Sequence, residues 1–207
     1  MFKRFLITSL TAASLSAGGV AFANEVAADA LIRKNVTEIL AAIKADPALQ
    51  AGDAKKMEKL ADEKVIPFFN FNKMTQLAVG RGWKEATDAQ KTALTNEFRT
   101  LLVRTYSTQM AQFRNQTIDV KAPKGATPAD IEVTVKTVIN QPGSSGIPID
   151  YSMEKGKDGW KVFDVLVDGV SLVTNYRSSF GKEIQTTGID GLIKVLADRN
   201  AKNVAKS

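Results

Sequence analysis

The clearest pattern in the sequence is a long amphipathic segment at about residues 87–113. Its apolar side chains recur at intervals of three and four positions, which is typical of one face of a helix. The stripe consists of Leu94, Phe98, Leu101, Leu102, Tyr106, Met110 and Phe113. Such a stripe ordinarily packs into a protein core. The pattern therefore predicts a long helix, but it does not say what the apolar face contacts.

Residues 160–167 have a different pattern, almost continuously apolar and rich in β-branched and aromatic side chains. At this length the pattern predicts a strand. Strict alternation places Trp160, Val162 and Leu166 on one face, and Phe163, Val165 and Val167 on the other. Both faces then need cover from helices, from another sheet or from an apolar ligand.

The sequence after this strand predicts a turn and a helix. Asp168 and Gly169 are typical turn residues, and Ser171 is a suitable N-cap. Apolar residues then recur every four positions at Leu172, Tyr176, Phe180 and Ile184. The strand, the turn and the helix form a corner with apolar surface inside both arms, and we expect this corner to be the centre of the fold.

Other helices are predicted on both sides of the long one. Residues 25–44 carry an apolar stripe that ends at Asp46 and Pro47, and a short helix follows between Gly52 and Pro67. After an aromatic cluster, Asn72 is the predicted cap of a third helix. A last helix is predicted from Gly188. The stripe of the first helix consists of Leu31, Ile32, Val36, Ile39, Leu40 and Ile43, and the aromatic cluster of Phe68, Phe69 and Phe71.

Beyond Asn115 the period changes from 3.6 to 2, which indicates strands. Alternating segments lie near residues 118–120, 131–137 and 147–154, and residues 160–167 make a fourth. Strands joined by short loops form an antiparallel sheet. The predicted fold is α+β, with the sheet's apolar face covered by the 87–113 helix and the helix after Ser171.

The expected organisation is one domain behind a cleaved leader. Residues 24–115 are mainly helical, 116–167 form the sheet, 168–198 the C-terminal helices and 199–207 a flexible tail. Residues 1–23 have the basic, apolar and small-residue regions of a secretory signal peptide, including Lys3, Arg4 and the Ala21-Phe22-Ala23 cleavage site. The apolar run is too short and too diluted for a membrane anchor. We expect an exported, soluble protein, periplasmic if the source is bacterial.

The composition excludes several kinds of chemistry. The 207 residues include no cysteine and no histidine, which removes thiol nucleophiles, Cys/His zinc sites and Ser-His-Asp triads. The net charge is +6, but the lysines and arginines are scattered, whereas a nucleic-acid binder clusters them with aromatic residues. The sequence also has no Gly-rich phosphate loop. We expect no nucleic-acid partner, no metal and no cofactor.

A few charged residues remain as candidates for chemistry. Asp164 interrupts the apolar strand, either as a general base in an apolar pocket, as an edge carboxylate facing water, or as the partner of Arg177 or Lys161. The structural alternatives are favoured because buried carboxylates usually have partners. Guanidinium groups suit phosphate oxygens, so the arginines are candidate phosphate contacts or plain surface charges. These are Arg81, Arg99, Arg104 and Arg177.

Three stretches resemble the MlaC family of exported phospholipid-binding proteins, also called the toluene-tolerance family. The first is VIPFFNFNKM at residues 65–74 with AVGRGW at 78–83, where Gly82 departs from the expected pattern. The second is Gln90 with FRTLLVRTY at 98–106. The third and most specific is WKVFDVLVDGVSLVTNYRSSF at 160–180 with GIDGLI at 188–193. The resemblance covers essentially the whole predicted mature chain in the right order.

The resemblance implies a monomeric, non-enzymatic phospholipid carrier in the periplasm of a Gram-negative bacterium. It would move lipid between an outer-membrane lipoprotein and porin complex and an inner-membrane ABC transporter with a periplasmic lipid-binding subunit, and so maintain outer-membrane lipid asymmetry. The resemblance also implies an NTF2-like fold, with phospholipid as cargo, acyl chains between sheet and helices and the head group near solvent.

A phospholipid cargo requires a large apolar cavity inside the protein. Two acyl chains with about thirty methylenes represent roughly 24 kcal/mol of transfer free energy, which the protein must nearly match. We expect a dry cavity of about 1,000 Å³. The predicted lining is Phe98, Leu101, Leu102, Tyr106 and Met110 from the long helix, and Tyr151, Val165, Val167, Val170, Val173 and Tyr176 from the sheet and the corner.

Two other functions remain open. One is a small NTF2-like enzyme that acts on an apolar substrate through Asp164; Asp164→Asn would then abolish an activity, whereas a carrier would keep its lipid. The other is a periplasmic interaction module with a solid core. A tightly filled interior would favour that module.

Overall fold

A computed structural model describes residues 27–110, 116–125, 127, 129–140, 143 and 145–204. The predicted signal peptide and Phe113 lie outside the described residues. The helices are α1 (Ala28–Ala45), α2 (Pro47–Gln50), α3 (Ala54–Lys64), η1 (Ile66–Phe68), α4 (Phe71–Val79), α5 (Gly82–Glu85), α6 (Asp88–Met110) and α7 (Leu172–Val204). The strands are β1 (Thr117–Lys121), β2 (Glu132–Asn140), β3 (Ile147–Gly156), β4 (Gly159–Val167) and β5 (Val170–Ser171).

The strands form one antiparallel sheet in the order β1-β2-β3-β4-β5. The predicted α+β class and antiparallel pairing are confirmed, but the prediction of four strands is wrong. The fifth strand has two residues, too few to show a period of 2 in the sequence. It returns along β4 through Asp168 and Gly169, whose φ angles of 51° and 79° suit a two-residue hairpin turn.

A β-bulge changes which side chains of β4 share a face. Ser152 of β3 pairs with Asp164, and the next residue, Met153, pairs with Val162, so one residue of β4 is extra. The extra residue reverses the alternation. Val162, Val165 and Val167 therefore lie on the same face of the sheet, and the prediction that Val162 faces away from the other two is wrong.

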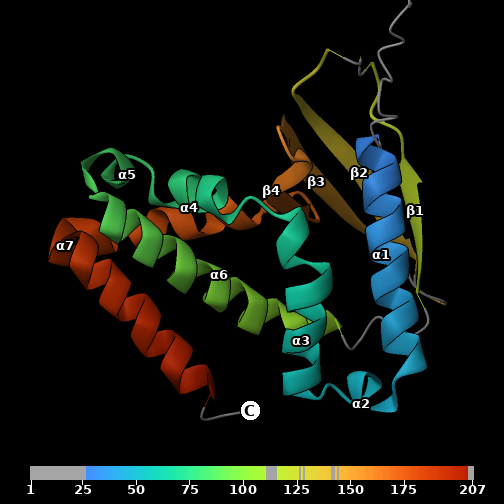
Figure 1. The fold of residues 1–207 in the computed structure, drawn as a ribbon, viewed down its shortest axis with the longest axis horizontal. Helices are drawn as coiled ribbons and strands as arrows, with labels where there is room; N and C mark the ends of the chain where they lie inside the picture. The colour runs from blue at the N-terminus through green and yellow to red at the C-terminus, as the bar shows by residue number, and fades with distance from the viewer. Residues whose placement is uncertain are drawn as a thin grey trace, which may run out of the picture.

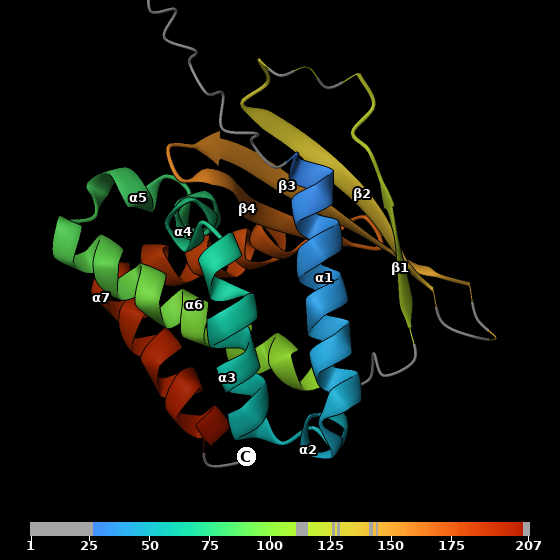
Figure 2. The same cartoon turned by 45° about the vertical axis from the view of Figure 1, so that its right-hand side comes forward.

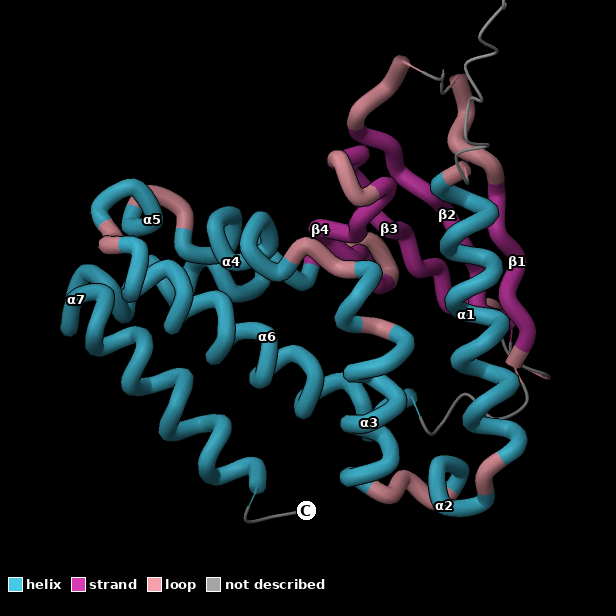
Figure 3. Tube along the Cα trace, viewed as in Figure 1, coloured by secondary structure: helices cyan, strands magenta, loops and turns pink. Residues whose placement is uncertain are grey.

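Helix α1 covers the inner face of the sheet. It packs against β1 and β2, and both views show it alongside these strands (Figures 1 and 2). The start of α7 packs against β4, as predicted, but α6 packs mainly against α7, α3 and α4. The helices α4 to α7 form a block beside the sheet rather than a layer on it (Figure 3).

The apolar stripe of α6 is used in this helical block. Phe98 is fully buried, and its ring lies edge-on to Tyr176 and Phe180 of α7, with centroid distances of 5.1 Å in both cases. Leu94 and Leu101 lie in the same core. This core holds α6 and α7 together, so only the last turns of α6 face the sheet.

Two helix ends differ from the predictions. Asn70, not Asn72, caps α4, and its side-chain oxygen accepts a hydrogen bond from the Lys73 amide at 3.0 Å. The two halves of α7 meet at Gly188, as predicted, where the backbone has φ 77° and ψ −177°. The second half differs from the predicted flexible tail because it continues past Arg199. Asn200 is buried there, and its amide donates to the Glu97 carbonyl at 3.0 Å.

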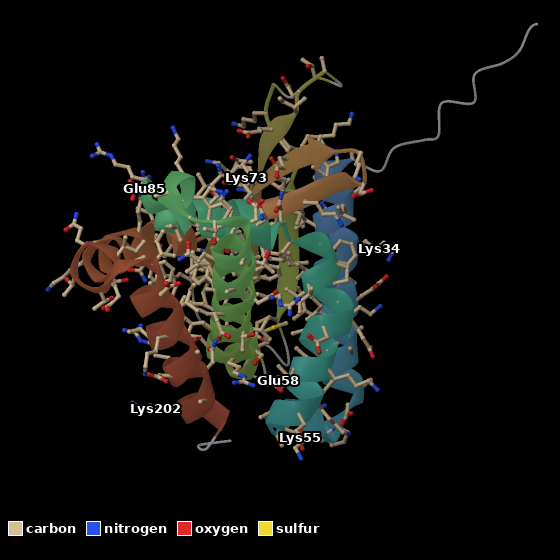
Figure 4. The ribbon with its side chains drawn as sticks, turned by 60° about the vertical axis from the view of Figure 1, so that its left-hand side comes forward. Lys34, Lys55, Glu58, Lys73, Glu85 and Lys202 are labelled. Atoms are coloured by element: carbon tan, nitrogen blue, oxygen red, sulfur yellow. The ribbon has the colours of Figure 1, made fainter. Side chains whose placement is uncertain are left out.

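Lys73 joins the helical block to the sheet. Its ammonium group contacts Glu132 of β2 and Glu154 of β3, both at 2.6 Å, and lies 3.8 Å from the centroid of the Phe163 ring. Burial alone lowers the pKa of Lys73, but the two carboxylates outweigh this effect and raise the pKa above 10.5. By contrast, Lys34, Lys55 and Lys202 project outward from their helices (Figure 4).

Candidate functional site: an apolar cavity between helices and sheet

A cavity of about 590 Å³ lies between the inner face of the sheet, α1, η1 and the end of α6, and it is partly open to solvent. Its volume is smaller than the predicted 1,000 Å³ and within the ordinary range for ligand sites. A solid core is therefore excluded. The lining includes Leu31, Ile32, Val36, Ile39, Leu40, Phe68, Phe69, Leu102, Val103, Tyr106, Met110, Ile147, Ile149, Tyr151, Met153, Val162, Val165, Val167, Val170 and Leu172.

The sheet side of the cavity consists of rows of side chains from paired strands. Ile149 pairs with Val167, and Tyr151 pairs with Val165. The next row, Met153 and Val162, is fully buried, whereas Val167 is 37% exposed and Val170 is 60% exposed. The cavity thus has a buried floor at Met153 and an exposed rim at the β4–β5 hairpin.

The helical side comes from α1 and α6. The inward stripe of α1 lines the cavity along the helix, and Ile39 and Ile43 also join a smaller core with α3. From α6 only the C-terminal part takes part. Because the earlier apolar residues of α6 pack against α7, the helix changes from core packing to cavity lining along its length.

The structure separates the predicted lining residues into two groups. Those on the cavity wall are Leu102, Tyr106, Met110, Tyr151, Val165, Val167 and Val170. Those that pack in the core between α6 and α7 and do not line the cavity are Phe98, Leu101, Val173 and Tyr176. On α6 the members of both groups have the same three- and four-residue spacing, so periodicity does not separate them.

The sequence interpretation missed the contribution of α1 and η1. Leu31, Val36 and Leu40 were identified as a helical stripe, and Phe68 and Phe69 as part of an aromatic cluster, but none was proposed for the site. The available signal was that the stripe of residues 25–44 precedes all other elements and had no predicted partner. An unpartnered apolar stripe is a candidate to cover the sheet.

None of the four candidate head-group arginines lines the cavity in the described structure. Arg104 donates to Glu58 at 3.1 Å and to the Asn200 carbonyl at 2.6 Å. The guanidinium of Arg177 lies against Gly80, the residue after α4. Arg81 precedes α5, and Arg99 is half-buried on α6. Their role as phosphate contacts stays a prediction.

Asp164 lies on β4 but does not belong to the cavity wall. One carboxylate oxygen accepts hydrogen bonds from the amides of Val165 at 2.8 Å and Val173 at 3.2 Å, and the other accepts from the Ser171 hydroxyl at 2.5 Å. Ser171 also caps α7, as predicted, by accepting from the Thr174 amide at 3.0 Å. Asp164 thus fixes the start of α7 on the sheet, and the general-base hypothesis has no geometric support.

Asp164→Ala is expected to lower the free energy of unfolding by about 2 kcal/mol, because the start of α7 loses its acceptor. Urea denaturation followed by the fluorescence of Trp83 and Trp160 measures the change. Asp164→Asn retains one acceptor oxygen and should lose less. Bound lipid per folded molecule should stay unchanged in both variants, and an unaltered urea midpoint for Asp164→Ala would contradict the structural role.

A second depression of about 640 Å³ lies at the connection between β1 and β2. Its wall includes Lys121, Lys124, Asp130 and Glu132, so charges of both signs face it. Such a wall does not suit hydrocarbon. Among the described residues no group of acidic side chains has the arrangement of a metal site, and no described helix is long and apolar enough to cross a bilayer.

The fold and the cavity define a class: an α+β protein with a curved antiparallel sheet and an apolar ligand cavity against its inner face. The chain belongs to the MlaC family, because the family model for MlaC protein matches residues 33–198. The resemblance inferred from the sequence is thereby confirmed.

A solved structure supports the same assignment. It is a phospholipid-binding protein from Ralstonia solanacearum, determined in complex with a phospholipid. It matches with a TM-score of 0.80 and 36% identity, over 86% of this chain and 99% of that one.

Two relatives are more distant. The toluene tolerance protein ttg2D of Pseudomonas putida is 26% identical over 107 residues, which span 52% of this chain and only 49% of that protein. The intermembrane phospholipid transport system binding protein MlaC of Haemophilus influenzae is 21% identical over 165 residues, or 79% of this chain and 77% of that protein. None of the three relatives is described as an enzyme.

Proposed function

We propose that this chain is a phospholipid carrier that holds acyl chains in the cavity between α1, α6 and the sheet. The observation that carries the proposal is the apolar cavity in a fold shared with the Ralstonia solanacearum protein, which was solved with a phospholipid. The proposed lipid contacts are the residues of the cavity wall. The four core residues between α6 and α7 support the wall from behind.

The energetics agree with a carrier. Each methylene that enters the cavity contributes about 0.8 kcal/mol, as it does in the bilayer that the lipid leaves. A wall made almost wholly of aliphatic and aromatic groups therefore makes the exchange nearly neutral, and lipid enters and leaves without an energy source in the carrier itself. Because the cavity is partly open, the head group lies at its rim, in contact with solvent, in the proposed complex.

The family suggests where the carrier works. We propose export to the periplasm by residues 1–23 and exchange of lipid with an outer-membrane lipoprotein and porin complex and with an inner-membrane ABC transporter. In this role the protein contributes to outer-membrane lipid asymmetry. The name of the Haemophilus influenzae relative, an intermembrane phospholipid transport system binding protein, supports the proposal.

The proposal is tested by mass spectrometry of organic extracts from protein purified without detergent. Phospholipid in stoichiometric amounts is expected, and its head groups and chain number are read from the same spectra. Transfer between donor and acceptor vesicles then tests the carrier role. Protein free of phospholipid that also fails to accept it from vesicles would overturn the proposal.

A further inference from the structure

The polar groups of the cavity wall differ in whether the protein satisfies them. Asn35 donates to the Lys64 carbonyl at 2.6 Å. Tyr106 lies close enough to Tyr176 to raise the pKa of that phenol, although burial is the larger cause. The hydroxyl of Tyr151, in contrast, has no hydrogen-bond partner among the described residues. Burial raises the pKa of Tyr151 to about 12, with no contribution from a charged group or a hydrogen bond.

The position of Tyr151 relative to the rim is set by the strand register. Its pairing partner Val165 is one row inward from Val167, which is 37% exposed, and one row outward from the fully buried Val162 and Met153. Because alternate residues of a strand are about 7 Å apart, Tyr151 stands about 7 Å inside the rim. Tyr151 therefore belongs to the row between the exposed rim and the buried floor.

At this depth a bound diacyl phospholipid places the ester groups that join its glycerol to its acyl chains. With the head group at the rim, the ester groups that join glycerol to the chains are the first atoms to enter, and everything beyond them is hydrocarbon. An ester carbonyl accepts hydrogen bonds, and a phenol donates one. A hydroxyl that faces an apolar cavity loses its water when acyl chains fill the cavity, so a ligand that supplies an acceptor at this position gains affinity.

We propose that Tyr151 donates a hydrogen bond to an ester carbonyl of the bound phospholipid and so sets how deeply the acyl chains enter. The inference rests on the proposed function and adds to it a preference for ester-linked over ether-linked chains. The apolar wall confers affinity for any chain of suitable length. Tyr151 supplies the polar contact that fixes the position of the glycerol along the cavity.

The test compares diacyl phosphatidylglycerol with the dialkyl ether analogue of the same chain length. Binding to the delipidated protein is measured by competition with a fluorescent phospholipid. The wild-type protein should bind the ester lipid about three- to tenfold more tightly, the usual range for one hydrogen bond to a neutral group. Tyr151→Phe should lose this preference through weaker binding of the ester lipid, with binding of the ether lipid unchanged.

Tyr176→Phe is the control, because it removes the hydroxyl of a half-buried tyrosine that does not itself line the cavity. It should keep the wild-type preference. Equal affinities of the wild-type protein for both lipids, or an ester preference that survives in Tyr151→Phe, would overturn the assignment of Tyr151. Failure of the wild-type protein to bind either lipid would instead overturn the proposed function, so the two hypotheses fail in different ways.

Discussion

Ile149→Trp is expected to deprive the protein of most of its bound phospholipid while leaving it folded. Ile149 lies in the outer row of the cavity wall, opposite Val167, and its side chain is only partly buried. The larger indole extends into the space that the chains occupy. If it excludes about three methylenes, the loss is about 2.4 kcal/mol, or on the order of fiftyfold in affinity.

Thr134→Trp is the control for Ile149→Trp. Thr134 is exposed on the opposite face of the same sheet, so an indole there adds bulk to a strand without entering the cavity. Both variants are purified in the same way, and the lipid phosphorus per mole of protein is compared, with circular dichroism as the check on folding. Equal lipid content in the two variants would show that the chains do not lie along β3.

Phe98→Ala is expected to cause a large loss of stability with little change in bound lipid. Phe98 is fully buried between Tyr176 and Phe180, and the removal of a core phenylalanine typically costs about 3–5 kcal/mol. The measurement is urea denaturation of the delipidated protein, so that ligand binding does not contribute. Lipid per folded molecule should remain near the wild-type value.

Val36→Ala is the comparison for Phe98→Ala, because it is expected to weaken lipid binding with only a small loss of stability. Val36 lines the cavity from α1 and is only partly buried. Its truncation should cost about 1 kcal/mol of stability but weaken lipid binding, because the lost methyl groups contact the chains. If Phe98→Ala instead loses its lipid at nearly wild-type stability, Phe98 faces the ligand and the division of α6 into core and cavity parts is wrong.

The sequence and the structure agree where local physics decides. The long helix from Asp88, the turn at Asp168 and Gly169, the cap at Ser171 and the break at Gly188 depend on residues close in sequence. Helical periodicity, turn geometry and capping act within a few residues. For this reason the α+β class and the antiparallel sheet followed from the pattern alone.

Local patterns do not predict which side chains face the cavity where segments distant in sequence pack together. The stripe of α6 predicts one continuous face, yet Phe98 packs against α7 and Tyr106 faces the cavity. The difference depends on where α7 crosses α6, which no local spacing encodes. Likewise, the bulge beside Ser152 placed Val162 with Val165, although strict alternation separates them.

The sequence by itself determined the elements, the absence of cysteine and histidine chemistry, and the family through its motifs. Only the tertiary structure decided which apolar residues enclose empty space, that α1 rather than α6 covers the sheet, and that Asp164 holds the start of α7. The physical reason is that burial drives an apolar side chain out of water without specifying its neighbour. Whether that neighbour is another side chain or a cavity depends on how the helices and the sheet meet.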